Sequence, residues 1–348
     1  MHMALPPSDG KDLAVLRKDL MTTTVNRILS RAAVVAAIAL ALLYSPAARA
    51  ETTVRIGHFP NITHIQALVA HGFSRQGKGW FEQRLGADVK IEWYVYNAGP
   101  GAMEAMFANS IDVTYVGPSP AINAYAKSGG REVRIIAGSV NGGSALVVQG
   151  DSTLKIPADF RGKKIATPQF GNTQDVAARA WLIAGGLRFT LTGGDAQVLP
   201  TPNPDQLLLF RQKQLDAVWA VEPWISRLEQ EAGGRILVDD RDAITTVLVS
   251  RKDFLSSQRV LVKKLVAAHR ELTEWIKTHP DEAQRMAREE LDAELRAKLP
   301  PELVASAWKR VVLTGDVSVD ALKTYVSSAR SVGFLRDAPD ISGLIEAP

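Results

Sequence analysis

The chain has 348 residues, contains no cysteine, and carries 41 basic against 37 acidic side chains. The lack of cysteine excludes disulfides, thiolate metal sites, cysteine nucleophiles and lipid attachment at a cysteine. Six basic and three acidic residues lie in the first fifty positions, so the rest has a formal net charge of +1, and no basic stripe or helix-turn-helix pattern indicates nucleic-acid binding.

Residues 1–50 have the pattern of a secretory signal peptide. Arg27 and Arg31 precede an unbroken apolar run, Ala32–Leu43, and Ala48-Arg49-Ala50 supplies the small residues of a cleavage site. The run is shorter than the roughly 20 apolar residues that cross a bilayer comfortably. Cleavage after Ala50 is therefore expected, and a membrane anchor that stays attached is the alternative.

Met21 lies at the usual distance from the apolar run for a start residue, which would make residues 1–20 a start-site extension. Removal of the first fifty residues leaves 298, a length that suits two domains. We expect this mature chain to act in the periplasm as a monomer.

From Thr53 on, predicted strands and helices alternate in the order β-α-β-α-β, and this order occurs twice. The first set has strands at 53–58, 89–95 and 113–116, with helices at about 62–73 and from 102. The second set has strands at 163–167, 196–199 and 217–220, with helices at about 173–184 and from 207. Such alternation requires parallel strands joined by right-handed crossovers. The sequence therefore predicts an α/β fold with two doubly wound lobes.

The third strand of each set lies in a repeated stretch, Ile111–Ala126 and Leu215–Leu228. In both copies an Asp opens a β-branched and aromatic run typical of a buried strand, and a proline turn leads into a helix. In the first copy Ser119 can cap the helix, with Pro120 at its first position. The copies are 104 positions apart, far more than a solenoid period, so the repeat indicates two similar lobes.

Two further strands, at 144–149 and 245–250, are expected to cross between the lobes and form a hinge. The first follows the glycine-containing segment 138–143, and the second leads back after the second lobe. From Lys252 the pattern is helical, and these helices are expected to pack on the first lobe. The expected division is 51–140 plus 246–348 for the first lobe and 141–245 for the second.

Five strand-to-helix turns are expected to face one cleft between the lobes, because ligands of open parallel sheets lie off the carboxyl ends of the strands. The turns are at 60–64, 97–101, 117–120, 168–173 and 221–224, and they contain no Lys or Arg. Unpaired N–H groups and the positive dipole end of each helix make them potential anion sites. The candidate ligand-binding residues are Pro60, Asn61, His64, Gly99, Gly101, Tyr115, Gly117, Pro118, Ser119, Asn141, Gln169, Gly171, Asn172, Thr173, Trp219, Glu222 and Trp224.

These residue types also have structural interpretations. Histidines are often packed and hydrogen-bonded to backbone, glycines serve tight turns, Asn and Thr cap helices, and aromatic residues belong to cores. Glu222 would oppose a bare anion unless it is turned away, protonated, or paired with an ammonium group such as that of taurine. No H-E-x-x-H or comparable spacing indicates a metal site, and we expect neither a metal nor a cofactor.

The motifs IGHFPN, YNAGPGAMEAM, SIDVTYVGPSPAINAYA, GKKIATPQFGNTQD and DAVWAVEPW, in this order, resemble the periplasmic substrate-binding proteins of ABC importers for aliphatic sulfonates, taurine and nitrate. The resemblance covers residues 53–345. It implies a type II periplasmic-binding fold, a small oxyanion held between the lobes, and delivery to a permease and ATPase of the inner membrane. Proteins with this frame bind sulfonates, nitrate, bicarbonate or pyrimidines, so the ligand stays open. An aliphatic sulfonate is the ligand that we expect.

Two other classes share this frame. In an enzyme similar to the thiamine-pyrimidine synthases, His64 and Glu222 would be the catalytic residues. Those enzymes carry a Cys-rich motif that this chain lacks, so we expect no enzyme and no catalytic residue. A sensor or regulator would need a DNA-binding or membrane-spanning segment, and the sequence after Ala50 shows neither pattern.

Overall fold

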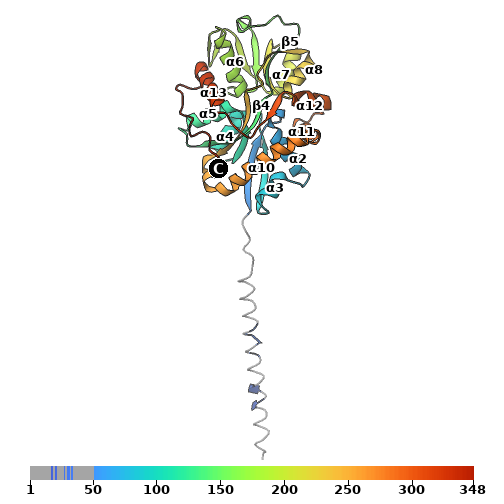
Figure 1. Ribbon diagram of the computed structural model, residues 1–348, viewed down its shortest axis with the longest axis vertical. Helices are drawn as coiled ribbons and strands as arrows, with labels where there is room; N and C mark the ends of the chain where they lie inside the picture. Colours follow the sequence, from blue (N-terminus) through green and yellow to red (C-terminus); the bar gives the residue numbers. More distant parts are fainter. Residues whose placement is uncertain (1–16, 19, 22–26, 28–29, 32, 34–50) are drawn as a thin grey trace, which may run out of the picture. The chain divides into compact units, whose positions relative to one another are not determined.

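The computed structural model describes residues 17–18, 20–21, 27, 30–31, 33 and 51–348 (Figure 1). The predicted cleavage site and nearly all of the predicted apolar run lie outside the described residues. No helix of the described part is both long and apolar enough to cross a membrane. The chain divides after Ala50, and residues 51–348 form one compact unit built around two sheets.

The first sheet has six strands in the order β13-β4-β12-β3-β1-β2. The strands are β1 (Thr52–His58), β2 (Val89–Val95), β3 (Val113–Val116), β4 (Val133–Gly142), β12 (Ile244–Arg251) and β13 (Val311–Leu313). β1 pairs in parallel with β2 and β3, whereas β12 is antiparallel to β3 and β4.

The second sheet has five strands in the order β11-β5-β10-β6-β9 and repeats this plan. Its strands are β5 (Ser144–Gln149), β6 (Lys164–Thr167), β9 (Gln197–Pro200), β10 (Ala217–Val221) and β11 (Gly234–Asp239). β6 is parallel to β9 and β10, and β5 is antiparallel to β10 and β11. In each sheet three parallel strands thus lie side by side, and the next strand, β12 or β5, is reversed. The predicted double β-α-β-α-β order is confirmed.

Helices cover both faces of each sheet. They are α2 (Ile65–Arg75), α3 (Trp80–Leu85), α4 (Gly99–Phe107), α5 (Pro118–Lys127), α6 (Thr173–Ala184), α7 (Asn203–Arg211), α8 (Trp224–Ala232), α9 (Lys252–Ser257), α10 (Arg259–Thr278), α11 (Pro280–Leu295), α12 (Pro301–Trp308) and α13 (Val319–Val332), with short 3-10 turns at Ile62–His64 and Pro157–Phe160. Along β3, Val113 and Tyr115 belong to the core beneath α2, α3, α10 and α11, and Val116 belongs to the core beneath α4, α5 and α13. Burial on both faces explains why this strand is apolar throughout.

The C-terminal helices do not all lie against the first sheet. α10 and α11 pack on α3 and α2 as expected, but α12 also contacts α8, and α13 also contacts α6 (Figure 1). The C-terminal segment therefore touches helices of both sheets.

The chain passes between the sheets twice, from β4 to β5 and from β11 to β12. Gly142 and Gly143 form the first crossing, with φ angles of 70° and 66°. This left-handed conformation favours glycine. A Cβ on Gly142 would also lie only 2.5 Å from the carbonyl oxygen of Arg310, so the crossing has no room for a side chain. The predicted lobe boundaries at 140/141 and 245/246 stay a prediction.

Candidate functional site

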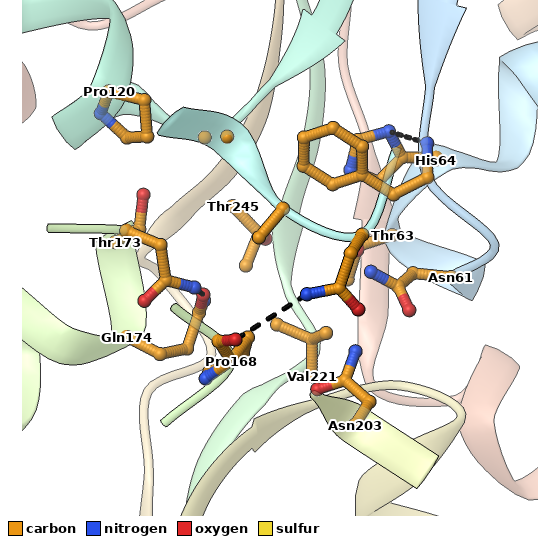
Figure 2. Close-up of a pocket in the computed structure, with 16 residues that line it drawn as sticks. Asn61, Thr63, His64, Pro120, Pro168, Thr173, Gln174, Asn203, Val221 and Thr245 are labelled. Atoms are coloured by element: carbon orange, nitrogen blue, oxygen red, sulfur yellow. Dashed lines mark hydrogen bonds between the residues drawn. The ribbon is translucent and has the colours of Figure 1, made fainter. Parts of the chain in front are cut away.

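All six parallel strands end at one cavity between the two sheets. It is lined by Phe59, Asn61, Thr63, His64, Asn97, Ala98, Gly99, Gly117, Pro120, Pro168, Asn172, Thr173, Gln174, Asn203, Val221 and Thr245 (Figure 2). The first turns of α4, α5, α6 and α7 therefore converge on it. The cavity has a volume of about 20 Å³, which gives room for one or two waters.

The cavity wall carries no charge. Among the described residues that line it there is no Asp, Glu, Lys or Arg, and its polar groups are amides, hydroxyls and one imidazole. An anion in this cavity would face helix N-termini and neutral donors, which is the environment that fixed helix dipoles make favourable for negative charge.

Asn61 presents its amide nitrogen to the cavity because of Trp224. The indole Nε1 of Trp224 donates to Asn61 Oδ1 over 3.0 Å. Indole is a donor only, so this bond fixes which end of the amide is the oxygen. Of the polar side-chain atoms that line the cavity, Asn203 Oδ1 is buried without a hydrogen-bond partner among the described residues.

His64 is a neutral donor. The backbone N–H of Phe59 donates to His64 Nδ1 over 3.3 Å, which leaves the ring proton on Nε2. Burial, together with the nearby His58, holds the pKa of His64 well below its usual value. The ring packs against Phe59 at 4.3 Å between centroids. His64 thus offers one N–H without a positive charge.

Thr173 joins the first turns of α5 and α6. Its Oγ1 accepts a hydrogen bond of 3.4 Å from the backbone N–H of Ser119. A Cβ on Gly117 would lie 2.3 Å from the same Oγ1, so only glycine allows this approach. Because a hydroxyl is both acceptor and donor, the Thr173 proton remains available to a ligand.

A buried carboxylate, that of Asp175, accepts hydrogen bonds that stabilise the turn before α6. Asp175 accepts from the Thr167 hydroxyl at 3.0 Å and from the N–H of Gly171 at 2.9 Å, and Arg179 donates to it at 3.2 Å. Asn172 caps α6 by accepting from the N–H of Asp175 at 2.9 Å. Capping, the structural interpretation of Asn172, is thus present, although the residue also lines the cavity.

Six of the predicted residues line the cavity, namely Asn61, His64, Gly99, Gly117, Asn172 and Thr173. Eleven do not, namely Pro60, Gly101, Tyr115, Pro118, Ser119, Asn141, Gln169, Gly171, Trp219, Glu222 and Trp224. Ten further lining residues were not among the named candidates. Six of them lie in the turns that were expected to face the cleft, namely Thr63, Asn97, Ala98, Pro120, Pro168 and Val221, and four lie outside those turns, namely Phe59, Gln174, Asn203 and Thr245.

The predicted aromatic residues have their polar atoms engaged elsewhere. The Tyr115 hydroxyl donates to His269 Nδ1 at 3.0 Å in the core beneath α10, because His269 Nε2 lies 2.8 Å from the carbonyl of Gly138 and donates there. Trp219 Nε1 donates to Ser144 Oγ at 3.2 Å. Neither ring reaches the cavity, since both side chains point to the helix-covered faces of their sheets.

Glu222 is turned away from the cavity and paired. It is fully buried, and its Oε1 lies 2.8 Å from Arg310 Nη1, while its Oε2 accepts from the N–H of Ser226 at 3.1 Å. Burial raises the pKa of Glu222, and Arg310 and Ser226 oppose that rise. The side chain of Ser119 is also buried off the cavity, where its Oγ has no partner among the described residues.

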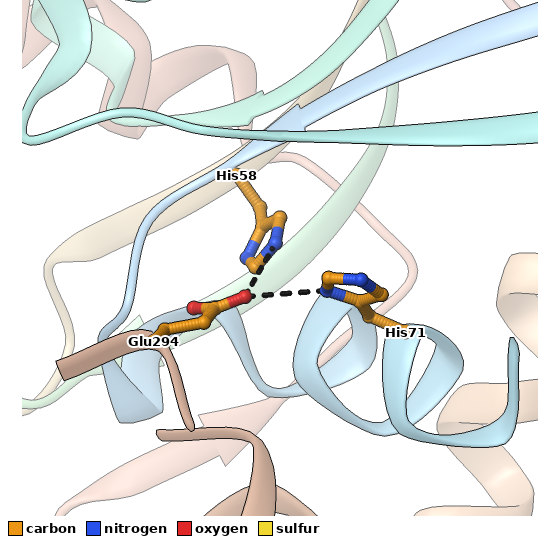
Figure 3. A group of neighbouring side chains, drawn as sticks. All are labelled: His58, His71 and Glu294. Carbon is orange, nitrogen blue, oxygen red and sulfur yellow. Dashed lines mark hydrogen bonds and ion pairs between the residues drawn. The ribbon is translucent and has the colours of Figure 1, made fainter. Parts of the chain in front are cut away.

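His58, His71 and Glu294 form a second polar group, between β1, α2 and α11 (Figure 3). Glu294 Oε1 lies 3.0 Å from His58 Nε2 and 3.2 Å from His71 Nδ1. Burial alone would raise the pKa of Glu294, but the hydrogen bonds from both histidines lower it to about 2. These residue types can ligate a metal. Here they already pair with one another, and His71 pairs with Glu290 at 2.8 Å.

The comparisons with known proteins agree with this architecture. The model of the NMT1-like family matches residues 47–289. A relative from Escherichia coli (strain K12), whose name gives aliphatic sulfonates as its ligands, is 30% identical over 158 residues, which is 44% of this chain and 47% of that one. The alkanesulfonate-binding protein of Xanthomonas axonopodis pv. citri, solved with bound MOPS, is 19% identical over 86% of this chain and 100% of that one, with a TM-score of 0.69. The periplasmic nitrate-binding protein of Synechocystis is 16% identical over 83% of each chain, with a TM-score of 0.65. At these identities the two structures show a shared periplasmic-binding-protein fold.

Proposed function

The chain belongs to the NMT1-like family, and from that premise we propose that it is the substrate-binding protein of an ABC importer, which captures a small oxyanion, an aliphatic sulfonate, between its two sheets. The observation that carries this proposal is the cavity itself. Helix N-termini from both sheets meet there, neutral donors line it, and its described wall holds no charged side chain.

Neutral donors suffice to hold an anion. Hydrogen bonds to a charged acceptor are roughly twice as strong as those between neutral groups. The N-terminus of a helix adds the equivalent of about half a positive charge. A cavity of this kind binds without a permanent cation, so release to a permease requires no ion pair to be broken.

A sulfonate is favoured over the alternatives by several observations. The Escherichia coli relative and the Xanthomonas structure are named for sulfonates, whereas the Synechocystis structure is named for nitrate, which is the alternative ligand. Taurine would need a carboxylate beside the cavity, and Glu222 is instead paired with Arg310. His64 lines the cavity, whereas the Glu222 side chain does not and is paired with Arg310, so these two residues do not form a catalytic pair there, and we propose a binding protein and not an enzyme.

Binding is proposed to close the two lobes about the two crossings, at Gly142-Gly143 and between β11 and β12. Two contacts at the cavity already join the two sheets. The Ser119 N–H donates to Thr173 Oγ1. Asn97 Nδ2 donates to the Pro168 carbonyl at 3.5 Å, the dashed line that ends at Pro168 in Figure 2. A ligand favours this closed arrangement only if it touches both sides. We place the protein in the periplasm, where it would hand the ligand to a permease and its ATPase.

Replacing Thr173 by valine tests the anion site. The change keeps the side-chain shape but removes the hydroxyl that lines the cavity, leaving a buried charged acceptor short of one donor. We expect binding of an aliphatic sulfonate to weaken by about 1 to 3 kcal/mol, measured by isothermal titration calorimetry. The matched control is Thr278→Val, on the exposed end of α10. Equal affinity for the Thr173 and Thr278 variants would argue against an anion at this position.

A further inference from the structure

A second, larger cavity lies directly beside the first. It has a volume of about 160 Å³ and lies between α4, α5, Phe170 in the turn before α6, and Phe334 just after α13. We call it the side pocket. The two cavities share Pro120, and neighbouring residues face different ones: Gly99 and Pro168 line the first cavity, and Pro100 and Phe170 line the side pocket.

The wall of the side pocket is mainly apolar, although Glu104, Asn123 and Lys127 also line it, and part of it is exposed to solvent. Phe107 and Phe170 are 41% and 43% exposed, which is unusual for side chains of this size. The rings of Phe170 and Phe334 lie 4.9 Å apart between centroids and close one side of the pocket. Covering such surface with hydrocarbon is favourable, because affinity grows with the apolar area removed from water.

From this geometry we propose that the side pocket binds the hydrocarbon tail of the ligand whose anionic head lies in the first cavity. The inference rests on the proposed function and makes it more specific, since it assigns the protein to sulfonates that carry an aliphatic or small aromatic tail. Nitrate and bicarbonate have no tail and would leave the side pocket unused.

The two volumes support this division of the ligand. The first cavity has room for one or two waters and therefore none for a tail. An apolar cavity of roughly 150 Å³ in another protein takes up benzene, so the side pocket suits a tail of up to about six carbons. The pocket wall comes from α4 and α5 on one side and from the β6–α6 turn on the other, so a tail placed there contacts the same two sides as the head.

The aromatic residues predicted from the sequence to recognise the tail do not line either of these cavities. The Trp224 indole orients Asn61, and Tyr115 and Trp219 point into the cores. Phe170 and Phe334 take their place in this proposal, and both lie in or beside irregular segments where no strand or helix periodicity marks them.

The test is a series of titrations of the mature protein with methanesulfonate, butanesulfonate and hexanesulfonate. In the wild type, affinity should rise about fourfold for each methylene group that enters the pocket. Phe170→Ala should reduce hexanesulfonate affinity about tenfold more than it reduces methanesulfonate affinity, and Phe107→Ala provides a second variant of the same pocket. The control is Leu208→Ala, which truncates a 44% exposed side chain on α7. This variant should show the same rise in affinity with the length of the sulfonate as the wild type.

The outcomes separate this inference from the proposed function. A flat series in the wild type, with methanesulfonate bound as tightly as hexanesulfonate, would overturn the side pocket and leave the anion site standing. The proposal would also be overturned if both Phe variants showed the same dependence of affinity on sulfonate length as the wild type. Failure of every sulfonate to bind would overturn the proposed function and this inference together.

Discussion

Replacing Gly117 by alanine should lower the affinity for a sulfonate by about 10- to 100-fold. The new Cβ would lie 2.3 Å from Thr173 Oγ1 and would occupy the small cavity in which we place the anion. Gly117 has φ of −69° and ψ of 156°, a conformation open to any residue, so the effect would come from steric contact and not from backbone strain. Overpacking of this kind costs about 1 to 3 kcal/mol. Titration calorimetry measures it directly.

A double variant distinguishes this contact from a general defect. In a Thr173→Ala background the obstructing hydroxyl is gone, so Gly117→Ala should then cost much less than it does alone. Gly101→Ala is the matched control, because a Cβ there meets no atom within 4 Å. Additive losses from the Gly117 and Thr173 changes, or equal losses from the Gly117 and Gly101 changes, would show that the two helix ends do not meet as described.

Replacing Arg310 by methionine should lower the free energy of unfolding by about 3 to 5 kcal/mol at about pH 8. Arg310 precedes β13 of the first sheet, and it donates to Glu222 at 2.8 Å and to Glu229 at 2.7 Å beside β10 and α8 of the second. Its loss would leave the fully buried Glu222 without a cation. Urea denaturation followed by circular dichroism gives the change.

The pH dependence of this variant follows from the same carboxyl. Burial already raises the pKa of Glu222, and Arg310 is the main group that opposes the rise, so the variant raises the pKa further. The folded variant then binds a proton more tightly than the unfolded chain does, and its stability increases as the pH falls. The loss of unfolding free energy relative to wild type should be largest at pH values above the raised pKa of Glu222. It should become smaller as the pH falls toward 4.5, the ordinary pKa of a glutamate.

Two further variants control for the loss of an arginine as such. Arg259→Met removes a 57% exposed side chain that pairs with Glu346, and exposed pairs contribute about 0 to 1 kcal/mol. Adding Glu222→Gln to the Arg310 variant should restore part of the stability, because no charge is then left buried. The buried pair would be contradicted if Arg310→Met lost no more unfolding free energy than Arg259→Met does. It would also be contradicted if adding Glu222→Gln restored no stability at any pH.

The fold was largely predictable because its signals are local and repeated. The stretches 111–126 and 215–228 correspond to β3 with α5 and β10 with α8, and the reversed strands β5 and β12 occupy equivalent positions in the two sheets. The short helix α3 and the edge strand β11 were not predicted. Both are too short to show a clear periodicity.

The residues that line the cavity could be predicted only where the internal sequence repeat indicated them. The turn before α7 corresponds to the turn before α4, and applying the repeat there would have identified Asn203 as a lining residue. The partners of Trp224 and Glu222 lie 163 and 88 residues away along the chain, and no local pattern reveals such pairings. In a strand buried on both faces, the sequence also does not say which side chains point to the ligand.

The most direct test of the anion site is a titration of the protein with four ligands in parallel: hexanesulfonate, nitrate, taurine and an uncharged pyrimidine. The proposed function predicts saturable binding of hexanesulfonate with one site per chain, weaker binding of nitrate and taurine, and none of the pyrimidine. Binding of the pyrimidine without binding of any sulfonate would contradict it.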